Sequence, residues 1–538
     1  MRLLSRNHGL VLLLSLAGCG GGDDAPPAPV RPQPAALMTT LDALAAFGEK
    51  RVGTMPGQMA GEYIRDRMAA IGLSDVHAES WTIPRHTVGA ASLAISIDGA
   101  AATSPGFDVF YGSGGGHAEG DLVFVGSATS TDLAGKDLTN KIALVERNRF
   151  YHRSTQYKNV TAAGARGMLY LSLAAMNERQ VGSVSLSWES VGPIPAITIG
   201  ADDGAAIRAA LAANKTVHAV MDAEVSAVKA TGSNWIGSIP GREAGQVVIG
   251  AHYDTWFVGS TDNSGGVAAL LALAASRKAQ GKPRYTLVFV AYDGEEVALY
   301  GGYDYLRRHR VETVDPILAV LNFEGPSARE SNTFGLAHSA LPLLDTAITS
   351  VGLEDLYNLY VGMEIVPELF GGIIPTDIQG IYRTNVPTIS TAVDSPYYHT
   401  RRDTPDKVDV DFLAEAVYAF DLALGIMLDH PPSDFVQVDS KLWNATVVPR
   451  ARAAGAPLQV DVTITDSVGA PQMMALVQGA LLYDDFFQAG ETAKLTDATG
   501  KVTLEFPAAQ ADMGAGRRFV HITSGPSWPL VEGIAKLP

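Results

Sequence analysis

Short apolar runs that alternate with helix-like segments between residues 229 and 430 constrain the fold of this chain more than any other feature. The runs have the length and aliphatic content of strands buried on both faces of a sheet. They lie at residues 247–253, 286–292, 317–323 and 386–391. The segments between them, including 265–280 and 297–309, have the length of covering helices. The alternation predicts an α/β domain with a largely parallel or mixed sheet.

A stretch of different character precedes this domain. Residues 36–73 carry apolar side chains at helical spacing and predict two helices. Residues 91–228 instead show short strand-like runs with glycine-rich turns. The change of character predicts that residues 91–228 form a unit distinct from the α/β domain that follows.

The C-terminal part is predicted to be a separate β-sandwich. Pro431 and Pro432 break the chain, and residues 433–538 alternate apolar and polar side chains around turn signals. The length of 538 residues and the hydrophobic content of 47% fit several globular modules rather than a disordered chain. A net charge of −17 argues against nucleic acid as a partner, because phosphate binding needs clustered Lys and Arg.

The N-terminus has the pattern of an export signal. Two arginines precede the apolar run 10–17, which is too short to span a bilayer and suits a signal peptide over residues 1–18. The run ends in Leu-Ala-Gly-Cys, which resembles a bacterial lipobox and implies lipid attachment to Cys19. Residues 19–35 would form a tether, and the protein is expected in the cell envelope. Cys19 is the only cysteine, so cysteine nucleophiles and thiolate metal sites are excluded.

The first chemical motif ends the run 247–253. His252 and Asp254 are two residues apart, so both side chains would leave the same face of a strand. A carboxylate at Asp254 could hold the second ring nitrogen of a metal-bound His252. Asp262 follows in the glycine-rich loop GSTDNSGG. Taken alone the pair is weak evidence, and a turn-capping aspartate is the commoner explanation of such a loop.

Three further motifs follow the later apolar runs. Glu295 and Glu296 are adjacent, and two carboxylates near a sheet are costly unless cations compensate them. The ordinary explanation of such a pair is the preference of a helix N-terminus for negative charge. Glu324 follows the third run, and His399 follows the fourth run and two tyrosines.

The common location of these motifs favours chemistry over the ordinary explanations. Ligands of open α/β sheets bind outside the carboxyl ends of the strands, and every motif is predicted to lie there. Two histidines with several carboxylates are the ligands that zinc takes when cysteine is absent.

The ordered motifs HYD, TDN.GG, DGEE, N-aromatic-acidic and YHT..DT resemble the M28 family of di-zinc peptidases, which includes aminopeptidases and glutamate carboxypeptidases. The resemblance implies a mixed-sheet zinc-exopeptidase domain of the phosphorylase/hydrolase-like fold. It implies that residues 36–90 and 229–430 form this domain together and that residues 91–228 are an insert. The runs DLTNKIALVERNRFYHRSTQYKNVTAAGARGMLYL and PAITIGADDGAAIRAAL resemble a protease-associated (PA) domain, a non-catalytic insert.

The resemblance implies two Zn²⁺ ions and a role for each ligand. Asp262 would bridge both metals. His252 and Glu324 would complete one site, and Glu296 and His399 the other.

Catalytic roles follow from the same resemblance. Glu295 would be the general base, and Tyr398 would donate a hydrogen bond to the tetrahedral oxyanion. Asp254 is expected to orient His252, as its spacing indicates. The family often has a cis peptide after the bridging residue, which here is Asp262–Asn263.

Two departures from the family pattern affect the site. Many members have Asp where this chain has Glu324, which changes the reach of that ligand. The stretch TDIQGIYRTNVP stands where many members show Ser-Asp-His, which affects the shape of the pocket.

Several activities are compatible with these motifs. We expect an exopeptidase acting on peptides or proteins, with an aminopeptidase favoured over a carboxypeptidase. Glutaminyl cyclases share the catalytic fold but use one zinc and generally lack the insert. Non-catalytic receptors of this fold have lost metal ligands, whereas every ligand position is filled here. The sequence leaves the oligomeric state open.

Overall fold

The computed structural model describes most of the chain from residue 27 onward. The predicted signal peptide and Cys19 lie outside the described residues. The described ranges are 27–148, 151–184, 191–297, 299–313, 315–330, 332–337, 341–357, 361–362, 376–382, 386–435, 443–466, 468–481, 489–508, 519–524 and 531–536.

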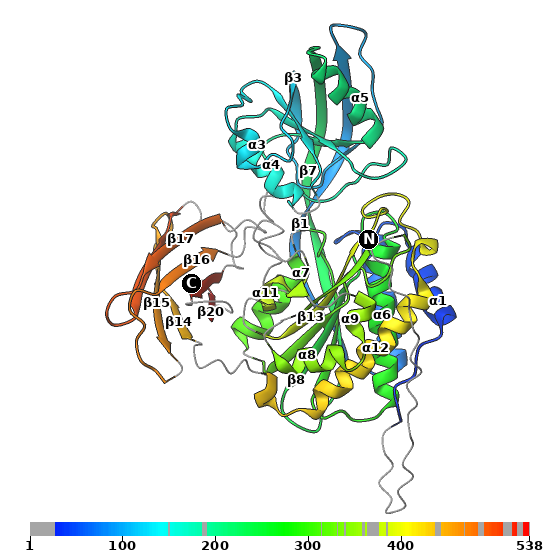
Figure 1. Cartoon of the computed structure of the whole chain (residues 1–538), viewed down its shortest axis with the longest axis vertical. Helices are drawn as coiled ribbons and strands as arrows, with labels where there is room; N and C mark the ends of the chain where they lie inside the picture. The colour runs from blue at the N-terminus through cyan, green and yellow to red at the C-terminus, as the bar shows by residue number, and fades with distance from the viewer. Residues whose placement is uncertain are drawn as a thin grey trace, which may run out of the picture.

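The centre of the α/β part is a set of parallel strands, and they are the apolar runs predicted from the sequence (Figure 1). Strand β9 has the predicted bounds, and the others differ by one to three residues at an end. The strands are β8 (Gln246–His252), β9 (Thr286–Tyr292), β10 (Ile317–Asn322) and β13 (Thr388–Asp394).

Antiparallel neighbours flank these strands and make the sheet mixed, as predicted. Strand β11 (Asn332–Ala337) pairs antiparallel with β13, and β12 (Val361–Gly362) lies beside β11. On the other side, β9 pairs antiparallel with β7 (Val217–Ile239).

Helices cover both faces of this sheet (Figure 1). One face packs against several apolar helices, and their side chains form a continuous core with β8, β9 and β10. These helices are α1 (Pro34–Ala45), α2 (Met55–Ile71), α6 (Gly265–Ala279), α8 (Pro342–Thr349), α9 (Leu353–Tyr357) and α12 (Val410–Asp429). The opposite face is covered by α7 (Tyr300–Leu306) and α11 (Gln379–Tyr382).

The predicted helix over residues 297–309 is displaced. Helix α7 begins at Tyr300 and continues as a π-helical segment, Arg307–Glu312. Leu299, just before it, has a left-handed backbone with φ of 56°. The chain therefore turns after β9 instead of entering a helix at once, and this turn carries Glu295 and Glu296.

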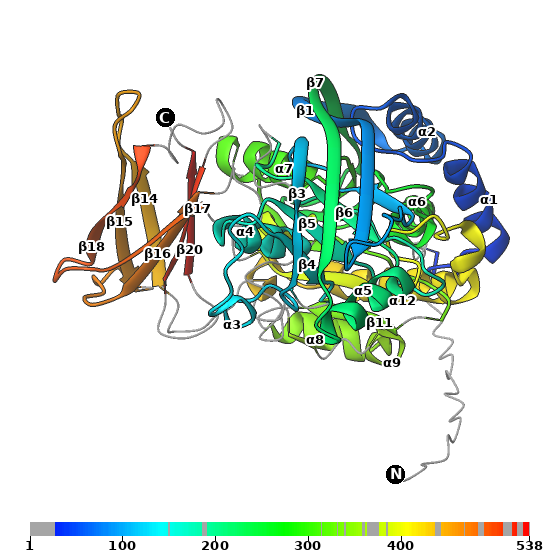
Figure 2. The same cartoon turned by 90° about the horizontal axis from the view of Figure 1, so that it is seen from above.

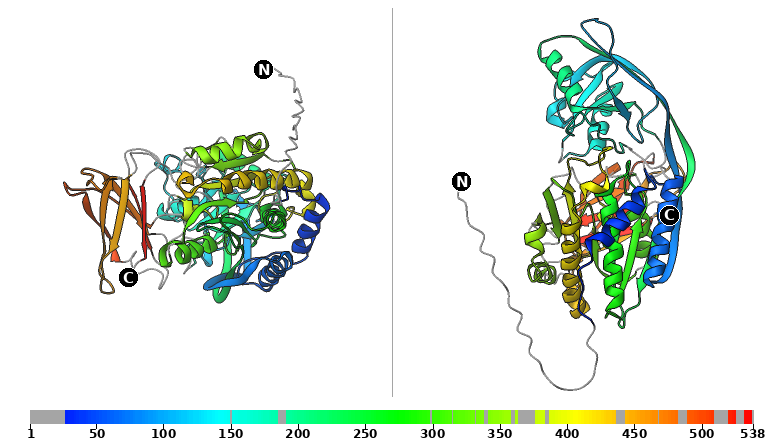
Figure 3. Two further views of the ribbon diagram at one scale, coloured as in Figure 1. Left: turned by 90° about the horizontal axis from the view of Figure 1, so that it is seen from below. Right: turned by 90° about the vertical axis from the view of Figure 1, so that its right-hand side faces the viewer.

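Two long strands join the α/β part to the insert. Strand β1 (Ser74–Ile97) pairs antiparallel with β7 along most of its length, and the right-hand view of Figure 3 shows this ribbon running between the two parts. The ribbon pairs with β9 at one end and with β3 (Gly116–Phe124) at the other. The predicted boundaries at 90/91 and 228/229 therefore fall inside continuous strands rather than in linkers.

The insert is a small β-rich unit with its own core. Its helices lie on both sides of a sheet that is mainly parallel in order β3, β4, β5, β6. Besides β3, its elements are β2 (Phe107–Val109), α3 (Ser130–Leu133), β4 (Ile142–Glu146), α4 (Arg153–Ala162), β5 (Gly167–Leu171), β6 (Ala196–Ile199) and α5 (Ala201–Ala212).

The C-terminal part consists of two antiparallel sheets, as the alternating pattern predicted (Figure 2). A Cβ atom added to Gly479 would lie 2.6 Å from Leu504 of the other sheet, so the sheets approach closely there. One sheet holds β14 (Trp443–Pro449), β15 (Leu458–Asp466) and β18 (Lys501–Phe506). The other holds β16 (Leu476–Leu481), β17 (Ala489–Leu495), β19 (Phe519–Ser524) and β20 (Val531–Lys536).

Among the described residues, none of the helices has the length and apolar character needed to cross a membrane.

Candidate metal centre

The predicted ligands meet at the carboxyl ends of the parallel strands. His252 is the last residue of β8, Glu296 follows β9 in the turn before α7, and Glu324 lies two residues beyond β10. Asp262 lies in the loop before α6, and His399 follows β13. Sheet topology thus brings together residues that are up to 147 positions apart in the sequence.

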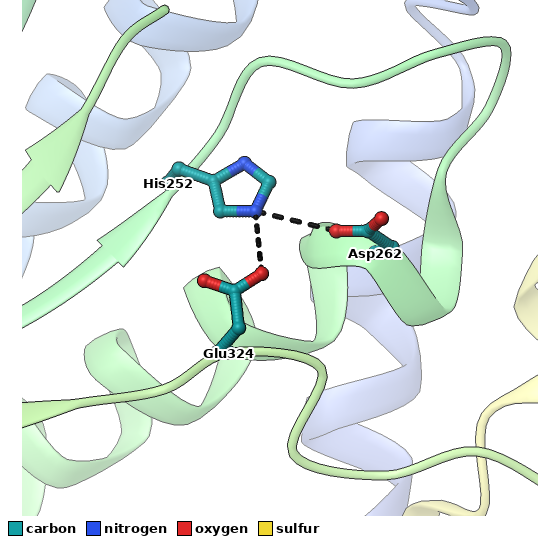
Figure 4. A group of neighbouring side chains, drawn as sticks. All are labelled: His252, Asp262 and Glu324. Carbon is teal, nitrogen blue, oxygen red and sulfur yellow. Dashed lines mark hydrogen bonds and ion pairs between the residues drawn. The ribbon is translucent and has the colours of Figure 1, made fainter. Parts of the chain in front are cut away.

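The first group consists of His252, Asp262 and Glu324 (Figure 4). The Nε2 atom of His252 lies 3.1 Å from Glu324 Oε1 and 3.3 Å from Asp262 Oδ1. Burial alone would lower the pKa of His252, but the nearby charges of Glu324 and Glu295 raise it well above its usual value.

The second group consists of Asp262, Glu296 and His399. The Nε2 atom of His399 lies 2.9 Å from Glu296 Oε1 and 3.0 Å from Asp262 Oδ2. The two carboxylate oxygens of Asp262 therefore face two different histidines. Burial opposes ionisation of Asp262, yet the hydrogen bonds from His252 and His399 hold its pKa below the usual value.

The donor set fits metal ions. The Nδ1 atoms of His252 and His399 lie 2.9 Å and 3.0 Å from the carbonyl oxygens of Asp254 and Val181. A carbonyl only accepts, so each Nδ1 carries a proton, and each Nε2 would offer a lone pair to a metal ion once its own proton has left. Glu324 Oε2 is buried without a hydrogen-bond partner among the described residues. Such a cluster of nitrogens and carboxylates is suited to zinc.

Asp254 acts differently from the prediction. Its main-chain carbonyl, rather than its carboxylate, accepts the short hydrogen bond from His252, and the carboxylate lies 3.6 Å from Nδ1. The chain turns after β8, so the carboxylate points to the turn after β9 instead. There it accepts the main-chain N–H groups of Glu295 at 3.0 Å and Glu296 at 3.2 Å. Asp254 thus fixes the turn that carries both glutamates.

Glu295 and Tyr398 lie beside the two groups. Burial raises the pKa of Glu295 well above its usual value; His252 opposes this effect, and Glu324 adds to it. The Tyr398 ring stacks on His399 with centroids 3.7 Å apart, and its hydroxyl accepts a hydrogen bond from Arg153 at 3.3 Å. Arg153 belongs to α4 of the insert, so the insert reaches the metal centre.

Some positioning residues were missed at the sequence level. Asp403, in the quoted YHT..DT motif, accepts the main-chain N–H groups of Thr261 at 2.7 Å and of Asp262 at 3.1 Å. Trp256 donates to Glu296 Oε2 at 2.7 Å, and no sequence motif indicated it.

Asn263, in the quoted TDN.GG motif, fixes the other side of the Asp262 loop. Its side chain donates to the carbonyl of Phe323 at 2.7 Å and accepts the N–H of Gly325 at 3.0 Å. These bonds link the loop to the residues on either side of Glu324. The peptide bond Asp262–Asn263 is cis, as the family resemblance implied.

A buried lysine supports the loop between Asp254 and Asp262. The Lys50 side chain is inaccessible to solvent, and its Nζ donates to the carbonyl of Val258 at 2.6 Å. Burial lowers its pKa from 10.5 to about 7, against the opposing attraction of Asp403 and Asp254. We therefore expect Lys50 to make the free energy of unfolding depend on pH.

The sign of this coupling follows from the two pKa values of Lys50. Between pH 7 and 10.5 the unfolded chain holds a proton that the folded chain releases, so the free energy of unfolding contributed by Lys50 rises with pH. We expect the stability difference between the wild type and Lys50→Met to shift in favour of the wild type across this range. Urea unfolding of the metal-free proteins at several pH values measures it, and a constant difference would contradict the prediction.

Comparison with known proteins supports the interpretation that the chain is a metallopeptidase. The model of peptidase family M28 matches residues 234–420, and the model of the PA domain matches residues 118–207. A probable glutamate carboxypeptidase of Arabidopsis thaliana is 27% identical over 193 residues, covering 32% of this chain and 27% of that protein. A glutamate carboxypeptidase 2 homolog of Caenorhabditis elegans is 26% identical over 208 residues, covering 32% of this chain and 26% of that protein. The chain thus spans about a quarter of the length of these curated relatives.

Solved structures share the fold. A zinc aminopeptidase from Bacillus subtilis is 19% identical with a TM-score of 0.57, covering 76% of this chain and 99% of that chain. A peptidase M28 precursor from Shewanella amazonensis is 22% identical with a TM-score of 0.59, covering 73% of this chain and 93% of that chain. The region that carries the metal centre, residues 234–420, belongs to peptidase family M28, and residues 118–207 within the insert form a PA domain.

Proposed function

We propose that this protein is a zinc-dependent exopeptidase in which two Zn²⁺ ions share the carboxylate of Asp262. The observation that carries the proposal is the division of that carboxylate, with Oδ1 facing His252 and Oδ2 facing His399. A carboxylate placed in this way would offer one oxygen to each of two cations. Glu324 and Glu296 each add a carboxylate to one side only.

The residues around the two groups suggest how hydrolysis proceeds. When bound, the zinc ions supply Lewis acidity that activates water and polarises the scissile carbonyl. Glu295 accepts the proton of the attacking water at its carboxylate and returns it to the leaving amine. The Tyr398 hydroxyl accepts from Arg153, so its own proton is available for the oxyanion that develops in the transition state.

The end of the peptide that is cut is the finer part of the proposal. We favour an aminopeptidase, as at the sequence level, and solved structures with the same fold include proteins named as aminopeptidases. A carboxypeptidase is the second candidate, because the guanidinium groups of Arg153 and Arg147 lie around Tyr398. These two guanidinium groups would attract the carboxylate of a peptide C-terminus and repel an α-ammonium group.

Blocked peptides separate the two candidates. For an aminopeptidase we expect that N-acetylation of a short peptide abolishes hydrolysis by the zinc-loaded protein, while C-terminal amidation leaves it nearly unchanged. Mass spectrometry of the products identifies the trimmed end. The reverse pattern, with KM raised about tenfold or more in Arg153→Met, would establish the carboxypeptidase. Failure to cut any unblocked peptide would contradict the proposed function.

We also propose that the protein is exported and anchored by lipid at Cys19. The proposal depends on the sequence pattern alone. The tether between residues 19 and 35 would then separate the metal centre from the membrane.

A further inference from the structure

The PA domain bonds directly to a residue of the metal centre. The N–H of Val181 donates to the carbonyl of His399 at 3.1 Å, and the His399 ring donates from Nδ1 to the carbonyl of Val181 at 3.0 Å. The neighbouring Gln180 donates from Nε2 to the carbonyl of Tyr398 at 3.2 Å. The segment Arg179–Val181 therefore holds both the main chain and the ring of His399.

The backbone of His399 needs such support. Its φ is 56°, in the left-handed region that residues other than glycine seldom adopt. Residues in such conformations persist when the surrounding structure over-determines them. Val181 bonds to both the carbonyl and the ring of His399, and so fixes the direction of Nε2.

An ion cluster fixes the segment Arg179–Val181 to the chain around His399. The carboxylate of Asp108, on β2 of the insert, accepts from Arg179 Nε at 2.7 Å. It also accepts two hydrogen bonds of 2.8 Å from the guanidinium of Arg401. Arg179 lies two residues before Val181, and Arg401 lies two residues after His399. Asp108 therefore links the segment Arg179–Val181 to the chain around His399.

The other histidine is held within its own part of the chain. The Nδ1 of His252 bonds to the carbonyl of Asp254, two residues further along. The two groups thus share Asp262 but differ in what orients their histidine.

We propose that the segment Arg179–Val181 is a positioning element for His399, and that strong zinc binding by Asp262, Glu296 and His399 requires this segment to be docked. The proposal rests on the proposed two-zinc function. The position formed by His252, Asp262 and Glu324 does not have this requirement. Docking of the PA domain therefore sets the affinity of one zinc position and leaves the other nearly unaffected.

The expected size of the effect follows from the role of such partners. Loss of a group that orients a metal-bound histidine lowers metal affinity about 10- to 100-fold. Asp108 does not contact His399, so Asp108→Asn acts on it only through the segment Arg179–Val181. The substitution leaves the guanidinium groups of Arg179 and Arg401 without the carboxylate that binds them both. We expect about a tenfold loss at one zinc position, because exposure of Arg401 weakens the ion pair.

Zinc titration of the full chain tests the proposal. Affinities for the first and second Zn²⁺ are measured against a competing chelator for the wild type, Asp108→Asn and Arg179→Met. Asp461→Asn is the matched control, because Asp461 also accepts two hydrogen bonds from one arginine, Arg450, within the C-terminal part. Circular dichroism and thermal unfolding show that each variant is folded.

The outcomes separate the two proposals. We expect both Asp108→Asn and Arg179→Met to lose affinity for one zinc ion only, and Asp461→Asn to bind as the wild type does. Wild-type affinity for both ions in both folded variants of the insert would overturn the inference while leaving the proposed function intact. A wild type that binds fewer than two zinc ions would instead overturn the proposed function.

Discussion

Asp262→Ala is expected to lose both zinc ions and to lower kcat/KM at least about 1,000-fold. Each oxygen of this carboxylate faces one histidine, at 3.3 Å for His252 and 3.0 Å for His399. Removing it therefore takes one ligand from each group at once. Loss of the two ions would also leave the carboxylates of Glu296 and Glu324 without the cations that compensate their charge, which is costly.

The number of zinc ions bound per chain shows whether Asp262 binds two ions or only one. The zinc content per chain is measured by elemental mass spectrometry after dialysis, together with kcat/KM on a peptide substrate. Glu324→Ala is the comparison, since Glu324 faces His252 alone and its loss should remove one ion. Two ions retained in Asp262→Ala, or equal losses in both variants, would show that Asp262 does not bridge.

The placement of these ligands could be predicted because few physical rules decide it. The strands β8, β9, β10 and β13 are apolar runs with no other stable place than the middle of a sheet. Their carboxyl ends must meet at one edge, and the ligands lie at those ends or in the loops that follow them. The fold and the shared edge therefore follow from the apolar runs, whereas the family resemblance supplied the role of each ligand.

Contacts between distant segments could not be predicted in this way. Nothing in the sequence around Val181 indicates that its carbonyl orients His399, because the contact depends on how the insert docks. Lys50 is equally inconspicuous, since only the folded chain buries its ammonium group against Val258. For Asp254 the residue was found but its hydrogen bonds were not, because the turn after β8 decides where the carboxylate points.

Glu295→Gln is expected to keep both zinc ions and to lower kcat about 100- to 10,000-fold, with KM nearly unchanged. Glutamine has the shape of glutamate but cannot accept the proton of the attacking water. Glu295 belongs to neither ligand group, and its main-chain N–H would still donate to Asp254. The substitution therefore removes the base and leaves the scaffold in place.

The adjacent residue supplies the matched control for this prediction. Glu296→Gln makes the same chemical change one position further along, but Glu296 lies 2.9 Å from the Nε2 of His399 and belongs to the second ligand group. We expect this variant to bind zinc more weakly at one position, with activity that partly recovers in excess zinc. Activity of Glu295→Gln should not respond to added zinc, because its metal positions are already filled. Turnover of Glu295→Gln within about tenfold of the wild type would show that another group takes the proton. The two neighbouring glutamates thus separate proton transfer from metal binding within a single turn of the chain.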